Sequence, residues 1–218
     1  MGEAALLVDF ASEPGDEAHR RVLALDAQLA RAPLPGVLET VPAPVTLLVC
    51  FDPEETDVEA LEAFLLEHAE RPSSGGTRAR EHVIPVCYAP PFAPDMDAVA
   101  ERLARPREAV AALHASVPYT VTMYGFAPGY AYLGGIPEGL RMPRKAQPER
   151  GHPVGSVMIA ASQCLITTLA MPTGWWVIGR TPTQVLEPQA EEPFLFAPGD
   201  TVRFRAIDAS EFARLAAG

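Results

Sequence analysis

Apolar and polar positions in the first part of the chain follow two different periods, which predict strands and helices in turn. Short apolar runs predict β-strands at residues 4–10, 36–41, 45–51 and 81–88. Apolar residues after the first run recur at helical spacing, as Ala18, Val22, Leu25 and Leu29. Thr56 and Glu59 have capping-box spacing and predict a second helix that ends near Glu70. The resulting order, βαββαβ, is that of a ferredoxin-like α/β sandwich.

The pattern changes twice in the rest of the chain. Two short helices are expected within residues 91–116, the first capped by Asp95 and the second opened by Pro106. Strand-like runs separated by Gly and Pro turns then follow at residues 117–126, 155–162, 163–170, 175–181, 193–198 and 201–207. We therefore predict an α+β protein with a ferredoxin-like domain at 1–90, bridging helices at 91–116 and an all-β barrel or sandwich at 117–218.

Composition and charge restrict the partners. With 48% hydrophobic residues, the 218-residue chain has ample material for a globular core. The net charge of -11 would repel nucleic acid and anionic membrane surfaces, so neither is expected as a partner. The acidic amino terminus and its short apolar run predict no signal peptide and a cytoplasmic protein. Cys50, Cys87 and Cys164 occur singly in apolar runs and predict buried thiols, without a disulfide or zinc site.

The segment YGFAPGYAYLGG, residues 124–135, contains the densest group of aromatic residues. Its glycines and proline are explained by a sharp turn after a strand. Its aromatic residues alternate and would share one face of an extended backbone, as Tyr124, Phe126, Tyr130 and Tyr132. That face is predicted to be either core or an exposed shelf for a ligand.

The chain has no nucleotide-binding or hydrolase motif of its own, because GxxxxGK[ST], GxSxG and HExxH are all absent. His114 is expected at the end of a helix, where a protonated imidazole would be stabilised. Arg144 and Arg180 offer guanidinium groups for a carboxylate or an acyl phosphate. A surface ion pair explains an arginine equally well, so these two assignments stay open at this point.

A series of segments in fixed order resembles the KipI family, also called allophanate hydrolase subunit 1, whose members include the B subunit of bacterial ATP-dependent 5-oxoprolinase. The segments are VIPVCY, FAPDM, LHASVPYTV, YGFAPGYAYLGGIP, MPRKAQP, PVGSVMIA, GWWVIGRTP and FAPGDTVRF. The resemblance spans nearly the whole chain. It implies a ferredoxin-like amino-terminal domain followed by a cyclophilin-like β-barrel domain.

The same resemblance implies a subunit of an ATP-dependent 5-oxoprolinase that is inactive alone. The implied partners are a KipA-type (allophanate hydrolase subunit 2) protein and a third, LamB/YcsF-type subunit, with a small lactam or amide as substrate. No cofactor or metal is expected on this chain, and ATP with Mg would be used by the assembled complex. The candidate catalytic residues are Arg144, Arg180 and His114. The candidate residues for substrate or partner binding are Tyr124, Phe126, Tyr130, Tyr132, Ser156, Gln163 and Trp175.

One segment departs from the family pattern. Where the family reads like GxQTGIYPxxxPGGW, this chain has ASQCLITTLAMPTGW, with Cys164, Leu165 and Thr167 in place of Thr, Gly and Tyr. A flexible polar turn has become apolar, which puts substrate and activity in question. The alternatives are a non-enzymatic regulatory binding protein of the histidine-kinase-inhibitor type and a subunit of a related complex that processes amides or urea derivatives. Peptidyl-prolyl isomerisation is suggested by fold analogy alone.

Overall fold

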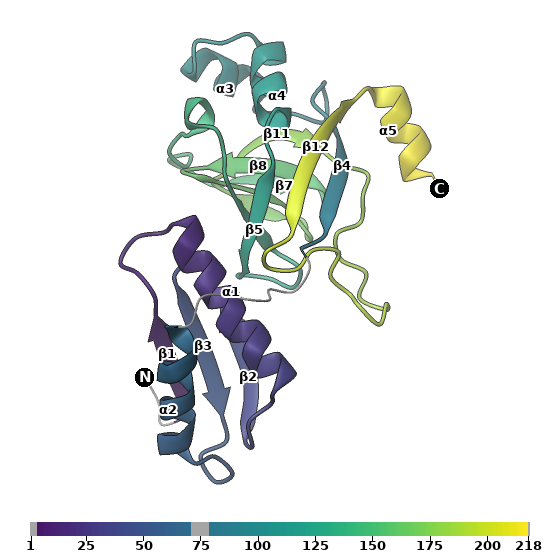
Figure 1. Ribbon diagram of the computed structural model, residues 1–218. Coiled ribbons are helices and arrows are strands. Elements are labelled where there is room, and N and C mark those ends of the chain that lie inside the picture. The colour runs from purple at the N-terminus through teal and green to yellow at the C-terminus, as the bar shows by residue number, and fades with distance from the viewer. Residues whose placement is uncertain (1–3, 71–78, 218) are drawn as a thin grey trace. The chain divides into compact units, whose positions relative to one another are not determined.

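The chain folds into two compact units, Met1–Ala79 and Arg80–Gly218 (Figure 1). The structure is a computed structural model that describes residues 4–70 and 79–217. Helices and strands occur together, and the second unit contains a closed barrel. The predicted α+β class with a barrel is therefore confirmed. None of the helices in the described part of the chain combines the length and hydrophobicity that crossing a membrane requires.

The first unit is a three-stranded antiparallel sheet with two helices packed on one face (Figure 1). The sheet has the order β1-β3-β2 and consists of β1 (Ala5–Asp9), β2 (Val37–Pro42) and β3 (Thr46–Phe51). Alternate residues of β3 are buried, as Leu47, Val49 and Phe51. They pack against α1 (Asp16–Arg31) and α2 (Val58–Ala69). The three strands and both helices occur where the hydrophobic pattern predicts them.

The start of α2 differs from the predicted capping box. Asp57 is the N-cap residue, and its carboxylate accepts a hydrogen bond from Ala60 N at 3.0 Å. The hydroxyl of Thr56 donates instead to Pro35 O at 3.4 Å. The helix begins one residue later than the capping-box pair predicts, because Asp is as good an N-cap as Thr and lies next to it.

The fourth predicted strand, β4 (Glu81–Cys87), belongs to the barrel, so its assignment to the ferredoxin-like sheet was wrong. It pairs in parallel with β12 (Thr201–Ile207) over its whole length. It also pairs with β11 (Trp176–Arg180), but only at Cys87. Pro85 predicted an edge or a bulge, whereas β4 has a neighbour on both sides. The short pairing with β11 accommodates a residue that has no N–H to donate.

The predicted helices at 91–116 also belong to the second unit and do not form a separate bridge. Both helices, α3 (Met96–Arg102) and α4 (Arg107–Ala115), contribute to the buried cluster that fills the barrel. Their contributions include Met96, Val99 and Val110. The unit boundary falls after Ala79, ahead of the predicted boundary at residue 90.

The barrel is closed and has seven strands in the order β11-β4-β12-β5-β6-β9-β8. The strands not yet placed are β5 (Tyr119–Tyr124), β6 (Ala131–Gly134), β8 (Ser156–Ala160) and β9 (Gln163–Ile166). A separate two-stranded sheet pairs β7 (Glu149–His152) with β10 (Met171–Thr173). The run at 193–198, predicted as a strand, forms only a bridge between Leu186 and Phe194. A short 3₁₀ helix, η1 (Glu138–Leu140), and a terminal helix, α5 (Ala209–Ala216), complete the unit.

Side chains of β8 and β9 alternate between two apolar clusters. Ile159 and Cys164 belong to the cluster that fills the barrel interior. Met158 and Leu165 belong to a second cluster, which also contains Trp175. Because successive side chains of a strand point to opposite faces, the second cluster lies on the outer face of the barrel wall. The candidate site is built on this outer cluster.

Candidate functional site

A pocket of about 180 Å³ opens on the outer face of the barrel wall. Its lining is largely apolar and aromatic and includes Tyr130, Tyr132, Met158, Leu165 and Trp175. Arg144 also lines it and is the only charged residue among the described lining residues. A small cavity that combines one cation with apolar and aromatic side chains is suited to a small anion that also carries a hydrophobic or planar part.

Arg144 is exposed, and its guanidinium carbon lies 5.5 Å from the centre of the Trp175 ring. This is a cation–π contact, which holds the guanidinium plane near the indole but leaves its N–H donors available. Within residues 4–70 and 79–217, no carboxylate forms an ion pair with Arg144. The guanidinium is therefore free to bind a carboxylate or phosphoryl group in the pocket.

Three of the four predicted aromatic residues lie at this pocket. Tyr130 is 4% exposed, and its hydroxyl donates to Thr167 Oγ1 at 3.2 Å. Tyr132 is half-buried, with its ring centre 6.0 Å from that of Trp175. Phe126 is 73% exposed and lies 5.5 Å from the ring of Tyr130. The segment is thus partly core and partly an exposed shelf.

Tyr124 lies apart from the other three. Its hydroxyl donates to Phe196 O, and its ring centre lies 5.3 Å from that of Phe194. The prediction that all four aromatics share one face was wrong, because the backbone turns sharply between β5 and β6. Phe126 and Gly129 have positive φ angles of 73° and 69°, which no extended strand contains.

Three other predicted residues do not line the pocket. Ser156 is buried at the start of β8, and its hydroxyl donates to Pro153 O at 2.7 Å. Gln163 is half-buried and begins β9. Arg180 ends β11, the strand that Trp175 precedes, and its Nε donates to Val154 O at 3.1 Å. The roles of these residues stay predictions.

His114 is also outside the pocket, because its side chain is fully buried within the barrel. Its Nδ1 lies 2.8 Å from the hydroxyl of Tyr88, and its Nε2 lies 3.3 Å from Cys164 Sγ. Burial lowers the pKa of His114 to about 3 and raises the pKa of the Cys164 thiol. The expectation of a protonated imidazole at the helix end was wrong, because desolvation outweighs the helix dipole at this depth.

The thiols follow the prediction in part. Cys87 and Cys164 are buried, whereas Cys50 is only half-buried, and all three are free. Among the described residues, no group of three or more His, Cys, Asp or Glu side chains is placed to hold a metal ion. The expected absence of a metal stays a prediction.

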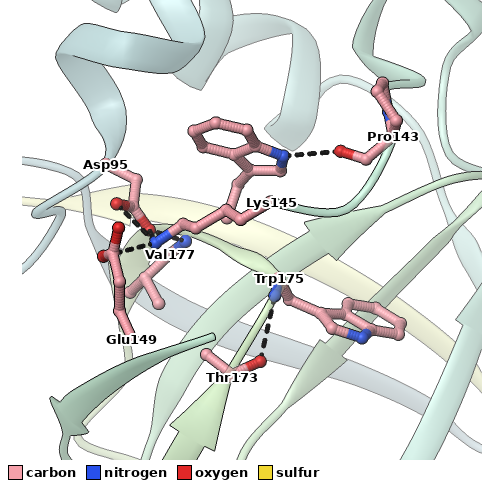
Figure 2. A network of polar contacts seen from close by, with 8 residues as sticks. Asp95, Pro143, Lys145, Glu149, Thr173, Trp175 and Val177 are labelled. Atoms are coloured by element: carbon pink, nitrogen blue, oxygen red, sulfur yellow. Dashed lines mark hydrogen bonds and ion pairs between the residues drawn. The ribbon is translucent and has the colours of Figure 1, made fainter. Parts of the chain in front are cut away.

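An ion-pair network beside the pocket was missed by the sequence analysis; it joins a buried Lys145–Asp95 pair to the exposed Glu149 (Figure 2). Lys145 Nζ lies 2.8 Å from Asp95 Oδ1, 2.7 Å from Asp95 Oδ2 and 2.8 Å from Glu149 Oε2. The hydrogen bond from Lys145 lowers the pKa of Glu149. Asp95 Oδ2 also accepts the Val177 N–H at 2.6 Å.

Asp95 was predicted to cap α3, and it does precede that helix, but its side chain makes no capping hydrogen bond. The carboxylate is directed to Lys145 and Val177 instead (Figure 2). One signal for the network is visible in the sequence: Lys145 is the only lysine among the 17 Lys and Arg residues of the chain. The tertiary contacts of Asp95 lie far along the chain, so no local pattern predicts them.

Comparison with known proteins places this architecture in a family. The family model "Carboxyltransferase domain, subdomain C and D" matches residues 1–196. The chain is 33% identical to the 5-oxoprolinase B subunit of Bacillus subtilis over 226 residues, which cover 97% of this chain and 93% of the relative. It is 35% identical to the 5-oxoprolinase B subunit of Escherichia coli O157:H7 over 205 residues, which cover 94% and 93%.

The solved structure of TTHA0988 is similar with a TM-score of 0.84 and 38% identity, over 94% of this chain and 40% of that chain. This chain therefore spans less than half the length of that protein. The match to the family model and the identity to both bacterial relatives cover most of the sequence. The chain belongs to the carboxyltransferase-domain family of subdomains C and D, together with the B subunits of bacterial 5-oxoprolinase.

Proposed function

We propose that this chain is the B-type subunit of an ATP-dependent 5-oxoprolinase, and that the pocket beside Arg144 and Trp175 holds the lactam. One observation carries the assignment of the pocket: an unpaired guanidinium is the only charged group among the described residues that line a cavity of about 180 Å³, and most of the other lining residues are apolar or aromatic. The names of the bacterial relatives supply the reaction.

The chemistry of 5-oxoproline matches this cavity. The molecule is a small ring that carries one carboxylate, and the guanidinium of Arg144 can bind that group with two parallel hydrogen bonds. The faces of Trp175 and Tyr132 provide apolar surfaces for the ring. Pockets for drug-sized ligands have volumes of roughly 300–1,000 Å³, so this smaller cavity favours a compact substrate.

The reaction needs activation because a lactam carbonyl is a poor electrophile. Transfer of the γ-phosphoryl group of ATP to the lactam oxygen releases ADP and makes the ring carbon reactive. Water then adds to that carbon, the C–N bond breaks with the nitrogen taking a proton, and a second water releases phosphate from the acyl phosphate. Water must be kept from the activated lactam until it is correctly placed, and the aromatic wall of this pocket supports that role.

In this proposal the chain binds and orients the lactam, and other subunits hold ATP and Mg. The partners are a KipA-type protein and a LamB/YcsF-type subunit, and the chain is inactive alone. Assembly in the cytoplasm, where ATP is available, is part of the same proposal. The single charged group at the pocket fits a binding role better than complete chemistry, because no described lining residue is a carboxylate, a histidine or a cysteine.

A regulatory binding role is the second candidate. Phe126 is 73% exposed at the rim of the pocket, where a partner segment would find an apolar contact. The replacement of a polar turn by Cys164 and Leu165 also favours it, since Leu165 forms part of the pocket wall. The two candidates differ in one measurable respect, which is whether a lactam stimulates ATP hydrolysis.

The deciding experiment is ADP release by this chain mixed with its purified KipA-type and LamB/YcsF-type partners, with and without 5-oxoproline. ADP release that requires both this chain and the lactam is expected. A reaction without this chain provides the background, and glutamate formation in equal amount establishes coupling. A stable complex that shows no lactam-dependent ADP release would contradict the enzyme role and favour the regulatory one.

A further inference from the structure

Lys145 has an environment that stability alone does not explain. Its side chain is 5% exposed and is enclosed by three carboxylate oxygens of Asp95 and Glu149. Burying an ion pair removes both charges from water, and apolar replacements of such pairs are often neutral or stabilising. Every other residue among the 17 Lys and Arg residues of the chain is arginine. A single lysine at a buried position therefore indicates that its side chain holds neighbouring parts of the structure in place.

Two hydrogen bonds to backbone carbonyl groups join the segment that contains Arg144 to the segment that contains Trp175. The Lys145 N–H donates to Gly174 O at 2.7 Å. The indole Nε1 of Trp176 donates to Pro143 O at 2.7 Å. Each contact lies one residue away from Arg144 on one segment and from Trp175 on the other. The two pocket residues are thus held from both sides, by one main-chain hydrogen bond and one hydrogen bond from a side chain to the main chain.

The ion pair adds a third connection between the same two segments. Lys145 Nζ contacts both carboxylate oxygens of Asp95, and Asp95 Oδ2 accepts the Val177 N–H at 2.6 Å. Asp95 therefore links the side chain of Lys145 to the backbone of β11. Figure 2 shows the ammonium group directed into this network, while the indole of Trp175 points away from it.

We propose that Lys145 is a positioning residue for the pocket: its ion pair with Asp95 fixes the guanidinium of Arg144 over Trp175, where it meets the carboxylate of the ligand. The identity of that ligand as 5-oxoproline rests on the proposed function. Lys145 acts through Arg144 and does not touch the ligand, since it is absent from the residues that line the pocket.

An arginine cannot replace Lys145 in this role. The ammonium group is compact and directs its donors to oxygens of two different side chains, whereas a guanidinium is larger, planar and suited to one carboxylate in its plane. The space is closed on one side by the ring of Trp176, whose centre lies 5.5 Å from Lys145 Nζ. Lys145→Arg keeps the charge and is expected to displace the segment that contains Arg144.

A double-mutant cycle tests the proposal in the assembled complex. Lys145→Met combined with Asp95→Asn removes the ion pair without leaving a buried charge and retains an acceptor for the Val177 N–H. This variant and Arg144→Met are each expected to raise KM for 5-oxoproline about tenfold, with kcat changed less than about twofold. Combining all three substitutions is expected to raise KM no further than Arg144→Met does.

Two results would overturn the proposal. One is a KM for the Lys145→Met, Asp95→Asn variant equal to that of the unaltered chain. The other is a KM about a hundredfold higher in the variant with all three substitutions, which would show that Lys145 and Arg144 act independently. Lys145→Arg provides a folded alternative, and it is expected to raise KM as well, so wild-type KM for this variant would count equally against the proposal. Arg203→Met, which breaks an exposed ion pair with Glu81, is the matched control.

A fluorescence measurement on the full chain is independent of substrate identity. The chain has only two tryptophans, so the difference between its emission and that of its Trp175→Phe variant isolates Trp175. This difference spectrum is expected to shift when Lys145→Met and Asp95→Asn remove the ion pair. It is not expected to shift when the same two substitutions are made in a chain that already carries Arg144→Met. If the complex lacks lactam-dependent activity, the proposed function fails and the difference spectrum alone decides the role of Lys145. A spectrum that is insensitive to the ion pair would overturn it.

Discussion

His114 Nε2 lies 3.3 Å from Cys164 Sγ inside the barrel, and this contact joins α4 to β9. The imidazole also stacks on Phe204 with ring centres 4.4 Å apart. A neutral imidazole can form a hydrogen bond with Tyr88 and another with Cys164, because it has one donor and one acceptor nitrogen. Protonation would place a charge in an apolar interior, so this histidine couples stability to pH.

The second unit is therefore expected to lose stability below neutral pH through His114. Its pKa is about 3 when folded and about 6.5 when unfolded, so the unfolded state binds one more proton between these values. The stabilisation is complete above pH 6.5 and is lost as pH falls toward 3, by about 1.4 kcal/mol per pH unit. Urea unfolding followed by tryptophan fluorescence reports this unit, since Trp175 and Trp176 both lie in it.

His114→Gln provides the comparison. The amide keeps a donor and an acceptor but does not titrate. From pH 7 to pH 5, the free energy of unfolding of the unaltered protein is therefore expected to fall by about 2 kcal/mol more than that of His114→Gln. Other titrating groups contribute to both proteins and cancel in the difference. An equal fall in the free energy of unfolding of both proteins would contradict the assignment of this pH dependence to His114.

Truncation of Tyr130 is expected to destabilise the protein much more than truncation of Phe126, although the two residues are close in sequence. Tyr130 is 4% exposed and hydrogen-bonded to Thr167, so Tyr130→Ala is expected to lower the free energy of unfolding by about 3–5 kcal/mol. Phe126 is 73% exposed, and Phe126→Ala is expected to change it by less than about 0.5 kcal/mol. Denaturant unfolding of both variants checks this, and equal losses would contradict the division into core and shelf.

Leu165 is expected to limit the size of the ligand, because its side chain forms part of the pocket wall and is 1% exposed. Leu165→Ala removes this part of the wall at a stability cost of about 3 kcal/mol. The variant complex is expected to accept a six-membered lactam carboxylate better, relative to 5-oxoproline, when kcat/KM is compared. Leu133→Ala is the matched control, since Leu133 is equally buried but faces the barrel interior. The same shift in preference in both variants would contradict the prediction.

The two arginines predicted from the sequence are expected to differ. Arg144→Met removes the only charged side chain among the described residues that line the pocket, and it is expected to raise KM about tenfold or more. Arg180 lies at the other end of β11 with its guanidinium carbon 5.7 Å from the ring of Phe212, so Arg180→Met is expected to leave KM unchanged. A fall in kcat alone on loss of Arg180 would support the catalytic role predicted for it. A raised KM in both variants would place both side chains at the ligand.

Several elements were predictable because neighbours in the sequence decide them. The spacing of Val22, Leu25 and Leu29 predicts α1, since one face of a helix repeats every 3.6 residues. The hairpin of β2 and β3 has a short connection, so its pairing is local. The aromatic segment at 124–135 was identified as a candidate site for the same reason, and three of its four aromatics do line the pocket.

The outer and inner faces of the barrel wall were not predictable in this way. β8 and β9 are apolar on both faces, so their pattern does not distinguish Met158 from Ile159, although only the first lies at the pocket. Likewise, nothing in the local sequence of Asp95 distinguishes a helix cap from a partner of Lys145. The tertiary contact prevails because a buried ammonium must be paired, whereas a helix terminus can be satisfied by water.

The sequence by itself determined the α+β class, the positions of most helices and strands, and the family, because these depend on local periodicity and on motifs in fixed order. Only the tertiary structure decided that β4 closes the barrel with β12, that His114 is buried and neutral, and that Arg144 and Trp175 form one wall. These features depend on pairings between residues far apart in the chain. Such pairings leave no periodic signal, because their free energy arises only when the barrel closes.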